Sequence, residues 1–123
     1  GSEVMAYLDE GLELAVQAGV DREQVLIDPG IGFGKTPAHN LTLLDRLNEF
    51  RALGRPILLG TSRKSFIAAV LGDQSLDART GGTAATAALG IERGARVLRV
   101  HDVRQMARVA GMADAILGNR TVE

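Results

Sequence analysis

The sequence predicts an α/β domain with about three parallel strands, and three features of its pattern support this. Short apolar runs alternate with longer segments whose apolar residues recur at helical spacing. A helix between two strands returns the chain to the same end of the sheet, so the strands pair in parallel. Residues suited to chemistry lie at the end of each predicted strand: Asp28 at the first, Gly60 and Lys64 after the second, and Arg99 and His101 closing the third. The carboxyl ends of parallel strands are where such folds place their sites.

The N-terminal half is expected to contain two helices and two strands. Gly19 can end the first helix in a left-handed conformation, and a strand is predicted at 25–27. Asn40 is expected to cap the second helix, which Gly54 ends. The first helix carries an apolar face of Val4, Leu8, Leu12 and Ala15, and the second one of Leu43, Leu44, Leu47 and Phe50.

The C-terminal half continues the alternation. Its predicted elements are a strand at 57–59, a helix from Ser62 to Leu71, a loop at 72–78, an Ala-rich helix at 79–93, a strand at 96–100 and a last helix that Asp102 caps. No linker or low-complexity segment divides the chain. A single domain over residues 1–123 is therefore expected, with Gly1-Ser2 interpreted as a cloning remnant.

The composition is that of a cytoplasmic enzyme or binding module. Its 123 residues are 46% hydrophobic and 24% charged, which is ordinary for a globular domain. A net charge of −1 and only 3% aromatic residues argue against a nucleic-acid partner. No apolar run approaches the length of a membrane span. The absence of cysteine excludes disulfides and thiolate metal sites.

The segment 28–35, DPGIGFGK, is the most informative part of the chain. Asp28 follows a buried strand, where a poorly solvated carboxylate needs a partner. The glycines let the backbone approach a flat ligand, and Phe33 is placed to stack on it. A Walker loop would need glycine at Pro29, and a dinucleotide fingerprint would need glycine at Lys35, so nucleotide binding is not expected. A plain Gly-rich turn is the alternative.

Two further sites of positive charge follow the later strands. Lys64 begins a predicted helix, where anions and carbonyl oxygens bind well. Arg99 interrupts an apolar strand and, if buried, needs an anion or a π-face. With His101 on the same face it would clamp a phosphate group. The alternatives are a solvated Lys64 and a structural salt bridge between Arg99 and Asp28. The spacing of Asp28 and His101 does not fit a metal-ligand set, so no protein metal site is expected.

Three motifs in this order resemble those of the dihydropteroate synthase family. They are DPGIGFGK at 28–35, TSRKS at 61–65 and RVHDV at 99–103, and the similarity runs from the first helix to near Glu123. The resemblance implies a (β/α)8 TIM barrel that joins 6-hydroxymethyl-7,8-dihydropterin pyrophosphate to p-aminobenzoate in folate biosynthesis. It also implies a sulfonamide target, a homodimer and Mg²⁺ bound with the pyrophosphate.

The resemblance further implies specific site residues. They are Asp28, Gly60, Lys64 and Arg99 for the pterin; Phe33, Lys64 and Ser65 for p-aminobenzoate; Arg99 and His101 for pyrophosphate; and Lys64, Arg99 and His101 for catalysis. Mg²⁺ leaves with the pyrophosphate in the family's reaction, and the aryl amine attacks the resulting pterin cation. The acceptor, the stacking cation and the anion clamp suit that charge pattern.

Three predicted strands match only the C-terminal half of an eight-stranded barrel. The family's protein ligand for Mg²⁺ is expected in the other half. We therefore expect a fragment that does not make dihydropteroate alone and that self-associates through strand edges or its last helices. A pterin-dependent methyltransferase and a non-catalytic half-barrel are the alternatives. A methyltransferase has no pyrophosphate to bind. The predicted anion clamp of Arg99 and His101 therefore argues against that alternative.

Overall fold

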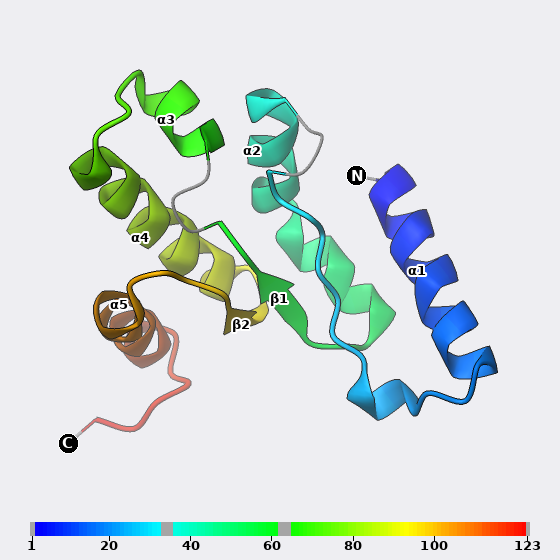
Figure 1. The fold of residues 1–123 in the computed structure, drawn as a ribbon. Helices are drawn as coiled ribbons and strands as arrows, with labels where there is room; N and C mark the ends of the chain where they lie inside the picture. Colours follow the sequence, from blue (N-terminus) through cyan, green and yellow to red (C-terminus); the bar gives the residue numbers. More distant parts are fainter. Residues whose placement is uncertain (1, 33–35, 62–64, 123) are drawn as a thin grey trace.

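The computed structural model describes residues 2–32, 36–61 and 65–122. Helices flank a short central sheet, and both termini lie at the periphery (Figure 1). In chain order the elements are α1 (Ser2–Gln17), the 3₁₀ helix η1 (Arg22–Gln24), α2 (Pro37–Asp45), the 3₁₀ helix η2 (Leu47–Leu53), β1 (Ile57–Leu59), α3 (Ser65–Leu71), α4 (Leu76–Glu92), β2 (Ala95–Leu98) and α5 (Val103–Ile116).

The sheet is parallel, as the sequence predicts, and β1 is its central element. β1 pairs with β2 in the order Ile57 to Ala95, Leu58 to Val97 and Leu59 to Leu98, with an irregularity after Ile57. On its other side β1 meets a single parallel bridge from Ile27. The predicted strand at 25–27 is thus wrong in extent. This segment pairs on one side only among the described residues, and Leu26 beside the bridge is 48% exposed.

The two faces of the sheet differ in burial. Ile57 and Leu59 are buried in the hydrophobic core, together with Ile27 and Ala95. Leu58 is half-buried, and Val97, its partner across the ladder, is 37% exposed. Because side chains alternate along a strand, one face packs on helices and the other stays open in the described part of the chain. The open face carries the residues of the candidate site.

The helix predicted after Asn40 differs in its start and its continuity. It begins at Pro37, with Thr36 as N-cap accepting from His39 N, because Pro is well suited to a first helical position. Asn40 is therefore not a cap but lies inside α2 and is buried. The apolar stripe of Leu43, Leu44, Leu47 and Phe50 is divided between α2 and η2. Gly54 ends η2, as predicted, and it does so in the left-handed conformation.

The other elements follow the predictions with shifted bounds. α1 ends before Gly19, which has a φ of 95°, and Asp102 caps α5 by accepting from Gln105 N. The predicted loop at 72–78 is shorter because Ser75 caps α4 by accepting from Ala78 N. β2 begins at Ala95 and ends at Leu98, two residues before the predicted end. Ser62, the predicted start of the third helix, lies outside the described residues.

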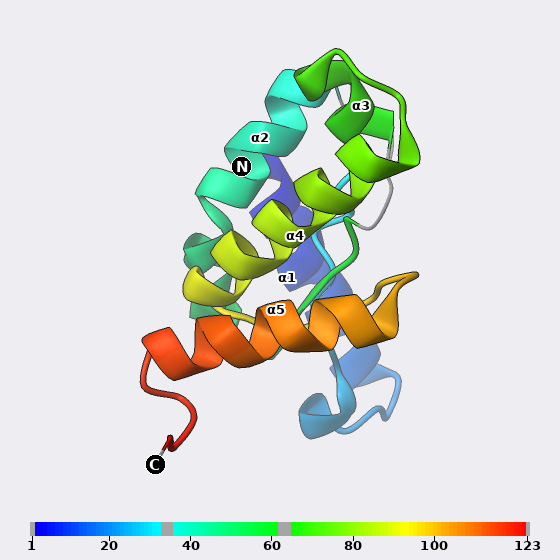
Figure 2. The same cartoon turned by 90° about the vertical axis from the view of Figure 1, so that its left-hand side faces the viewer.

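Helix α4 packs against its neighbours through glycine positions. α4 and α5 lie side by side in both views (Figures 1 and 2). A Cβ at Gly82 would overlap Ile67 Cγ2 of α3, and one at Gly90 would overlap Leu59 Cδ2 of β1. The helix therefore approaches both α3 and β1 more closely than an alanine allows. No helix in the described ranges has the length and hydropathy that a bilayer crossing requires.

Substitution of Gly82 by alanine is expected to lower the free energy of unfolding by about 1–3 kcal/mol. The new methyl group overlaps Ile67, a stiff β-branched side chain held in the core. Gly81→Ala is the matched control, since a Cβ there meets nothing within 4 Å. It should stabilise α4 by up to about 1 kcal/mol. Equal urea midpoints for the two variants would contradict the close approach.

Candidate functional site

Backbone hydrogen bonds bring three chain segments together at the edge of the sheet where its parallel strands end. Ile27 N donates to Pro56 O at 2.9 Å, and Leu58 N donates to Ile27 O at 2.7 Å. Beyond β2, Arg99 N donates to Leu59 O at 2.9 Å. Because the pairing is parallel, the residues that follow these bonds leave the sheet at the same end. They are Asp28, Gly60 and Arg99.

The same pairing places the three residues on one face. Ile27 lies opposite Ile57, so Asp28 shares the face of Leu58 and Gly60. Val97 lies opposite Leu58, so Arg99 belongs to this face as well. This is the open face of the sheet, where a ligand can approach. The sheet register alone thus brings an acid, a glycine and an arginine together.

Asp28 and Arg99 form an ion pair at this edge. Arg99 Nη1 lies 3.9 Å from Asp28 Oδ2, with 57% of the Arg99 side chain and 38% of the Asp28 side chain exposed. Arg99 is therefore not buried, because β2 ends at Leu98 and the face beyond it is open. The pairing of Arg99 with Asp28 that the sequence left as an alternative is present as a half-exposed contact. At 3.9 Å it is an ion pair and not a hydrogen bond.

Gly60 provides the space in which the Arg99 guanidinium lies. A Cβ built at Gly60 would be 2.7 Å from Arg99 Nη2, 3.1 Å from Cζ and 3.2 Å from Nε. Three guanidinium atoms at similar distance mean that the group lies across the backbone of Gly60. Any larger residue would displace it. The backbone conformation does not require glycine at this position, because the φ of Gly60 is not positive. The glycine is needed for the space that the guanidinium occupies.

The Gly-rich turn after Asp28 is held at both ends. Gly30 N donates to Asp28 Oδ1 at 2.8 Å, and Gly32 N donates to Asn40 Oδ1 at 2.8 Å. Gly30 and Gly32 have φ values of 74° and 88°, which non-glycine residues rarely adopt. Asn40 is a site residue that sequence reasoning missed. Its spacing of three and four residues to Leu43 and Leu44 on the apolar stripe would have revealed it as a buried residue.

A threonine pair holds the other exit from the sheet. Thr61 directly follows Gly60, is buried, and lies 2.6 Å from the hydroxyl of Thr86 in α4. The Thr86 hydroxyl donates to Thr83 O at 2.8 Å, so the Thr61 hydroxyl is the donor within the pair. The first residue of the TSRKS segment is thus held to α4 by a hydrogen bond.

The other predicted site residues are exposed or lie outside the described ranges. Ser65 is the first residue of α3 and is exposed. His101 is exposed in the bend before α5 and has a polar or electrostatic contact of its own. Phe33 and Lys64 lie outside the described residues. Within those residues, no three His, Cys, Asp or Glu side chains are grouped as a metal site.

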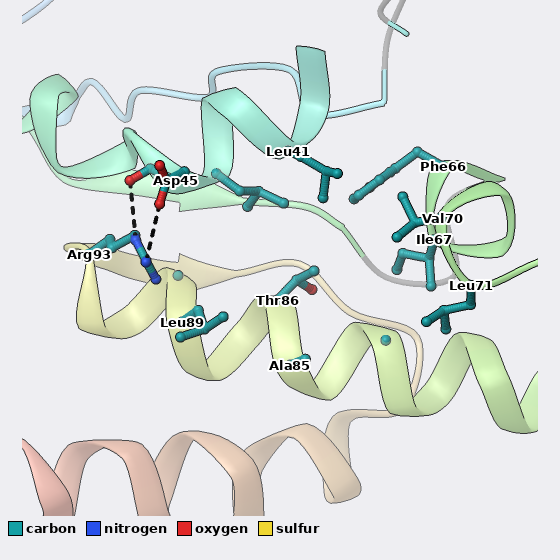
Figure 3. A pocket seen from close by; sticks show the side chains of 13 residues that line it. Leu41, Asp45, Phe66, Ile67, Val70, Leu71, Ala85, Thr86, Leu89 and Arg93 are labelled. Carbon is teal, nitrogen blue, oxygen red and sulfur yellow. Dashed lines mark hydrogen bonds and ion pairs between the residues drawn. The ribbon is translucent and has the colours of Figure 1, made fainter. Parts of the chain in front are cut away.

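An apolar pocket lies on the helical side of the molecule. It has a volume of about 280 Å³ and is lined by residues of α2, α3 and α4 (Figure 3). The Arg93–Asp45 ion pair, at 3.3 Å, lies at one end of it. Neither Asp28 nor Arg99 lines this pocket. It is therefore separate from the group of polar residues at the sheet edge.

Comparison with known proteins shows the family to which this chain belongs. The family model described as "Pterin binding enzyme" matches residues 2–101. The chain belongs to the pterin binding enzyme family. Among its relatives, the dihydropteroate synthase of Bacillus subtilis strain 168 is 49% identical over 115 residues. That alignment covers 94% of this chain and 40% of the relative.

Solved structures of the family agree. A dihydropteroate synthase from Xanthomonas albilineans, in complex with 7,8-dihydropteroate, matches with a TM-score of 0.90 at 40% identity. The match covers 94% of this chain and 46% of that one. One from Stenotrophomonas maltophilia gives 0.91 at 38% identity, over 98% of this chain and 45% of that one.

These synthases are TIM barrels, so this chain has the fold of part of a TIM barrel, as predicted. The chain spans less than half the length of the relatives described here.

Removing the Asp28–Arg99 pair should change stability little. Asp28→Asn keeps an acceptor for Gly30 N, and the pair is about half exposed, so each of Asp28→Asn and Arg99→Gln should cost less than about 1 kcal/mol. Ile57→Ala, a core substitution in β1, should cost about 2–5 kcal/mol in the same urea titration. A loss of about 3 kcal/mol or more from the Asp28 variant would indicate a buried structural pair instead.

Proposed function

We propose that this chain supplies the pterin-binding edge of a dihydropteroate synthase, the transferase that condenses 6-hydroxymethyl-7,8-dihydropterin pyrophosphate with p-aminobenzoate. The observation that carries the proposal is the meeting of Asp28, Gly60 and Arg99 on one face, in a chain of the pterin binding family. The synthases it resembles include one crystallised with 7,8-dihydropteroate and one with 4-aminobenzoic acid. The first of these ligands is the product of the proposed reaction, and the second is one of its two reactants.

Asp28 is suited to the aminopyrimidine edge of a pterin, which presents adjacent N–H donors. Its Oδ1 already accepts from Gly30 N, which fixes the carboxylate plane. Its Oδ2 is in ion-pair contact with Arg99 at a distance that leaves hydrogen bonding to a ligand possible. A carboxylate oriented in advance pays less orientational entropy when it binds.

Arg99 is suited to both the pterin ring and the anionic leaving group. Its guanidinium is always charged, is planar, and lies across Gly60 with much of its surface exposed. A flat ring can stack on it, and a pyrophosphate can accept its N–H donors. We assign His101 to the same anion, Phe33 and Ser65 to p-aminobenzoate, and Lys64 to both substrates. These four assignments follow the motifs and the family.

Magnesium enters this proposal only as the counter-ion of the pyrophosphate. The described residues offer no group of three suitable side chains, and the carboxylate of Asp28 is engaged with Arg99 and Gly30. The residues present in this part of the chain do not fit a magnesium site.

The pterin proposal can be tested by isothermal titration calorimetry with a pterin pyrophosphate analogue. Asp28→Asn should weaken binding about tenfold to a hundredfold, because a hydrogen bond to a charged acceptor is lost. Arg99→Ala should weaken it by a similar factor, since it removes the stacking cation and the anion contact. Both variants are expected to remain folded, so the loss would report on the site.

Arg93 and Asp45 provide the matched control for this experiment. They form the ion pair at the pocket of Figure 3, away from the sheet edge. Asp45→Asn and Arg93→Ala should leave the affinity unchanged. Equal affinities for all four variants, or no binding by the parent chain, would contradict a pterin site on this chain.

We also propose that the chain self-associates. The open face exposes Leu26 and Val97, and β2 has a strand edge without a neighbour among the described residues. Helices α4 and α5 expose Leu89, Met112 and Ile116. Unpaired strand edges and apolar patches of this kind favour association between copies.

Light scattering at tens of micromolar protein should give a mass above the 13.0 kDa of one chain. Val97→Lys would oppose association through the sheet and Ile116→Lys association through α5, because each introduces a charge on an exposed apolar surface. The variant that restores the monomer identifies the surface. A monomeric parent chain at this concentration would contradict the proposal.

A further inference from the structure

We propose that Asn40 is a positioning residue for the pterin site: it fixes the Gly-rich turn and, through the turn, the carboxylate of Asp28. The inference rests on the proposed function only for the identity of the ligand. The juxtaposition itself joins α2 to the turn across eight residues of sequence. Asn40 is not among the residues that the motifs indicate as site residues.

Asn40 contacts the turn directly, through a hydrogen bond that is shielded from solvent. Asn40 is 1% exposed, and its Oδ1 accepts from Gly32 N at 2.8 Å. Because a backbone N–H can only donate, the side-chain atom facing Gly32 must be the oxygen, and this fixes the orientation of the amide. A hydrogen bond shielded from water is not exchanged readily for one to solvent. The bond therefore holds the end of the turn in one place.

Packing alone does not explain an asparagine at this position. Asn40 Nδ2 is buried and has no partner among the described residues. A buried donor without a partner costs about 1–3 kcal/mol, and asparagine is a poor residue for a helix interior. Leucine at this point of the apolar stripe would bury more nonpolar surface and leave no polar atom. The amide is thus costly for stability, and what it provides is the acceptor for Gly32.

The turn transmits this contact to Asp28. Between Asp28 and Gly32 the chain passes through two glycines of positive φ, with the side chain of Ile31 buried in the core. One end is closed by Asp28 Oδ1 accepting from Gly30 N, and the other by Asn40. Releasing Gly32 permits the glycines to adopt other conformations. The carboxylate would then lose the fixed orientation that it shares with Gly30.

Amide hydrogen exchange measured by NMR on the intact chain tests the inference without ligand. Asn40→Leu fills the site without an acceptor, and Asn40→Asp keeps an acceptor oxygen. Leu43→Ala, three residues along the buried face of α2, is the control for general loss of stability. Exchange of Gly32 N–H and Gly30 N–H should accelerate at least tenfold in Asn40→Leu, relative to core amides such as that of Leu58. It should not do so in Asn40→Asp or Leu43→Ala.

Calorimetry with the pterin pyrophosphate analogue provides the second measurement. Affinity should fall about tenfold in Asn40→Leu and be restored in Asn40→Asp, while Leu43→Ala retains the parent affinity. Unchanged exchange of Gly30 in Asn40→Leu would overturn the inference, as would faster exchange with unchanged affinity. A parent chain that does not bind the analogue would refute the proposed function. The exchange of Gly30 and Gly32 would then still decide whether Asn40 positions the turn.

Discussion

The candidate site depends on the parallel pairing of two segments with β1. Backbone bonds from Ile27 and Arg99 to β1 bring together residues that are about seventy positions apart in sequence. β1 itself is held by core packing of Ile57 and Leu59, and by the close approach of α4 at Gly90. The alignment of Asp28, Gly60 and Arg99 therefore follows from the register, and not from attraction between their side chains. An ion pair of 3.9 Å with half-exposed partners is too weak to impose it.

Much of the fold could be predicted from the sequence because its signals are local. Apolar periodicity identified α1 and α5, and Pro56 and Gly60 bounded β1. The length of the first strand and the burial of Arg99 could not be predicted, since both depend on whether other strands cover the sheet. Asn40 shows a different limit. Its residue type is typical of a cap, but Pro37 starts the helix earlier and turns Asn40 toward the core.

The sequence predicts where the candidate site residues meet, but not which other residues hold them in place. The rule that parallel strands end at one edge predicts the meeting of Asp28 with Arg99, whose distance the structure gives. The residues that hold the edge came only from tertiary structure: Asn40 at the turn, and Thr86 opposite Thr61. Both contacts join segments that no local pattern relates. Supporting contacts of this kind decide how precisely a catalytic group is held.

The openness of the sheet sets the strength of the chemistry that these residues can perform. An ion pair or a hydrogen bond gains strength when water is excluded, since the effective dielectric constant falls. Here the face that bears Asp28 and Arg99 also bears half-exposed Leu58 and Val97, so water reaches the site in the described part of the chain. The synthase structures extend well beyond the part that this chain matches. Orientation of Asp28 and Arg99, the proposed pterin-binding groups, thus resides in this chain, whereas a low dielectric constant requires a cover on the open face.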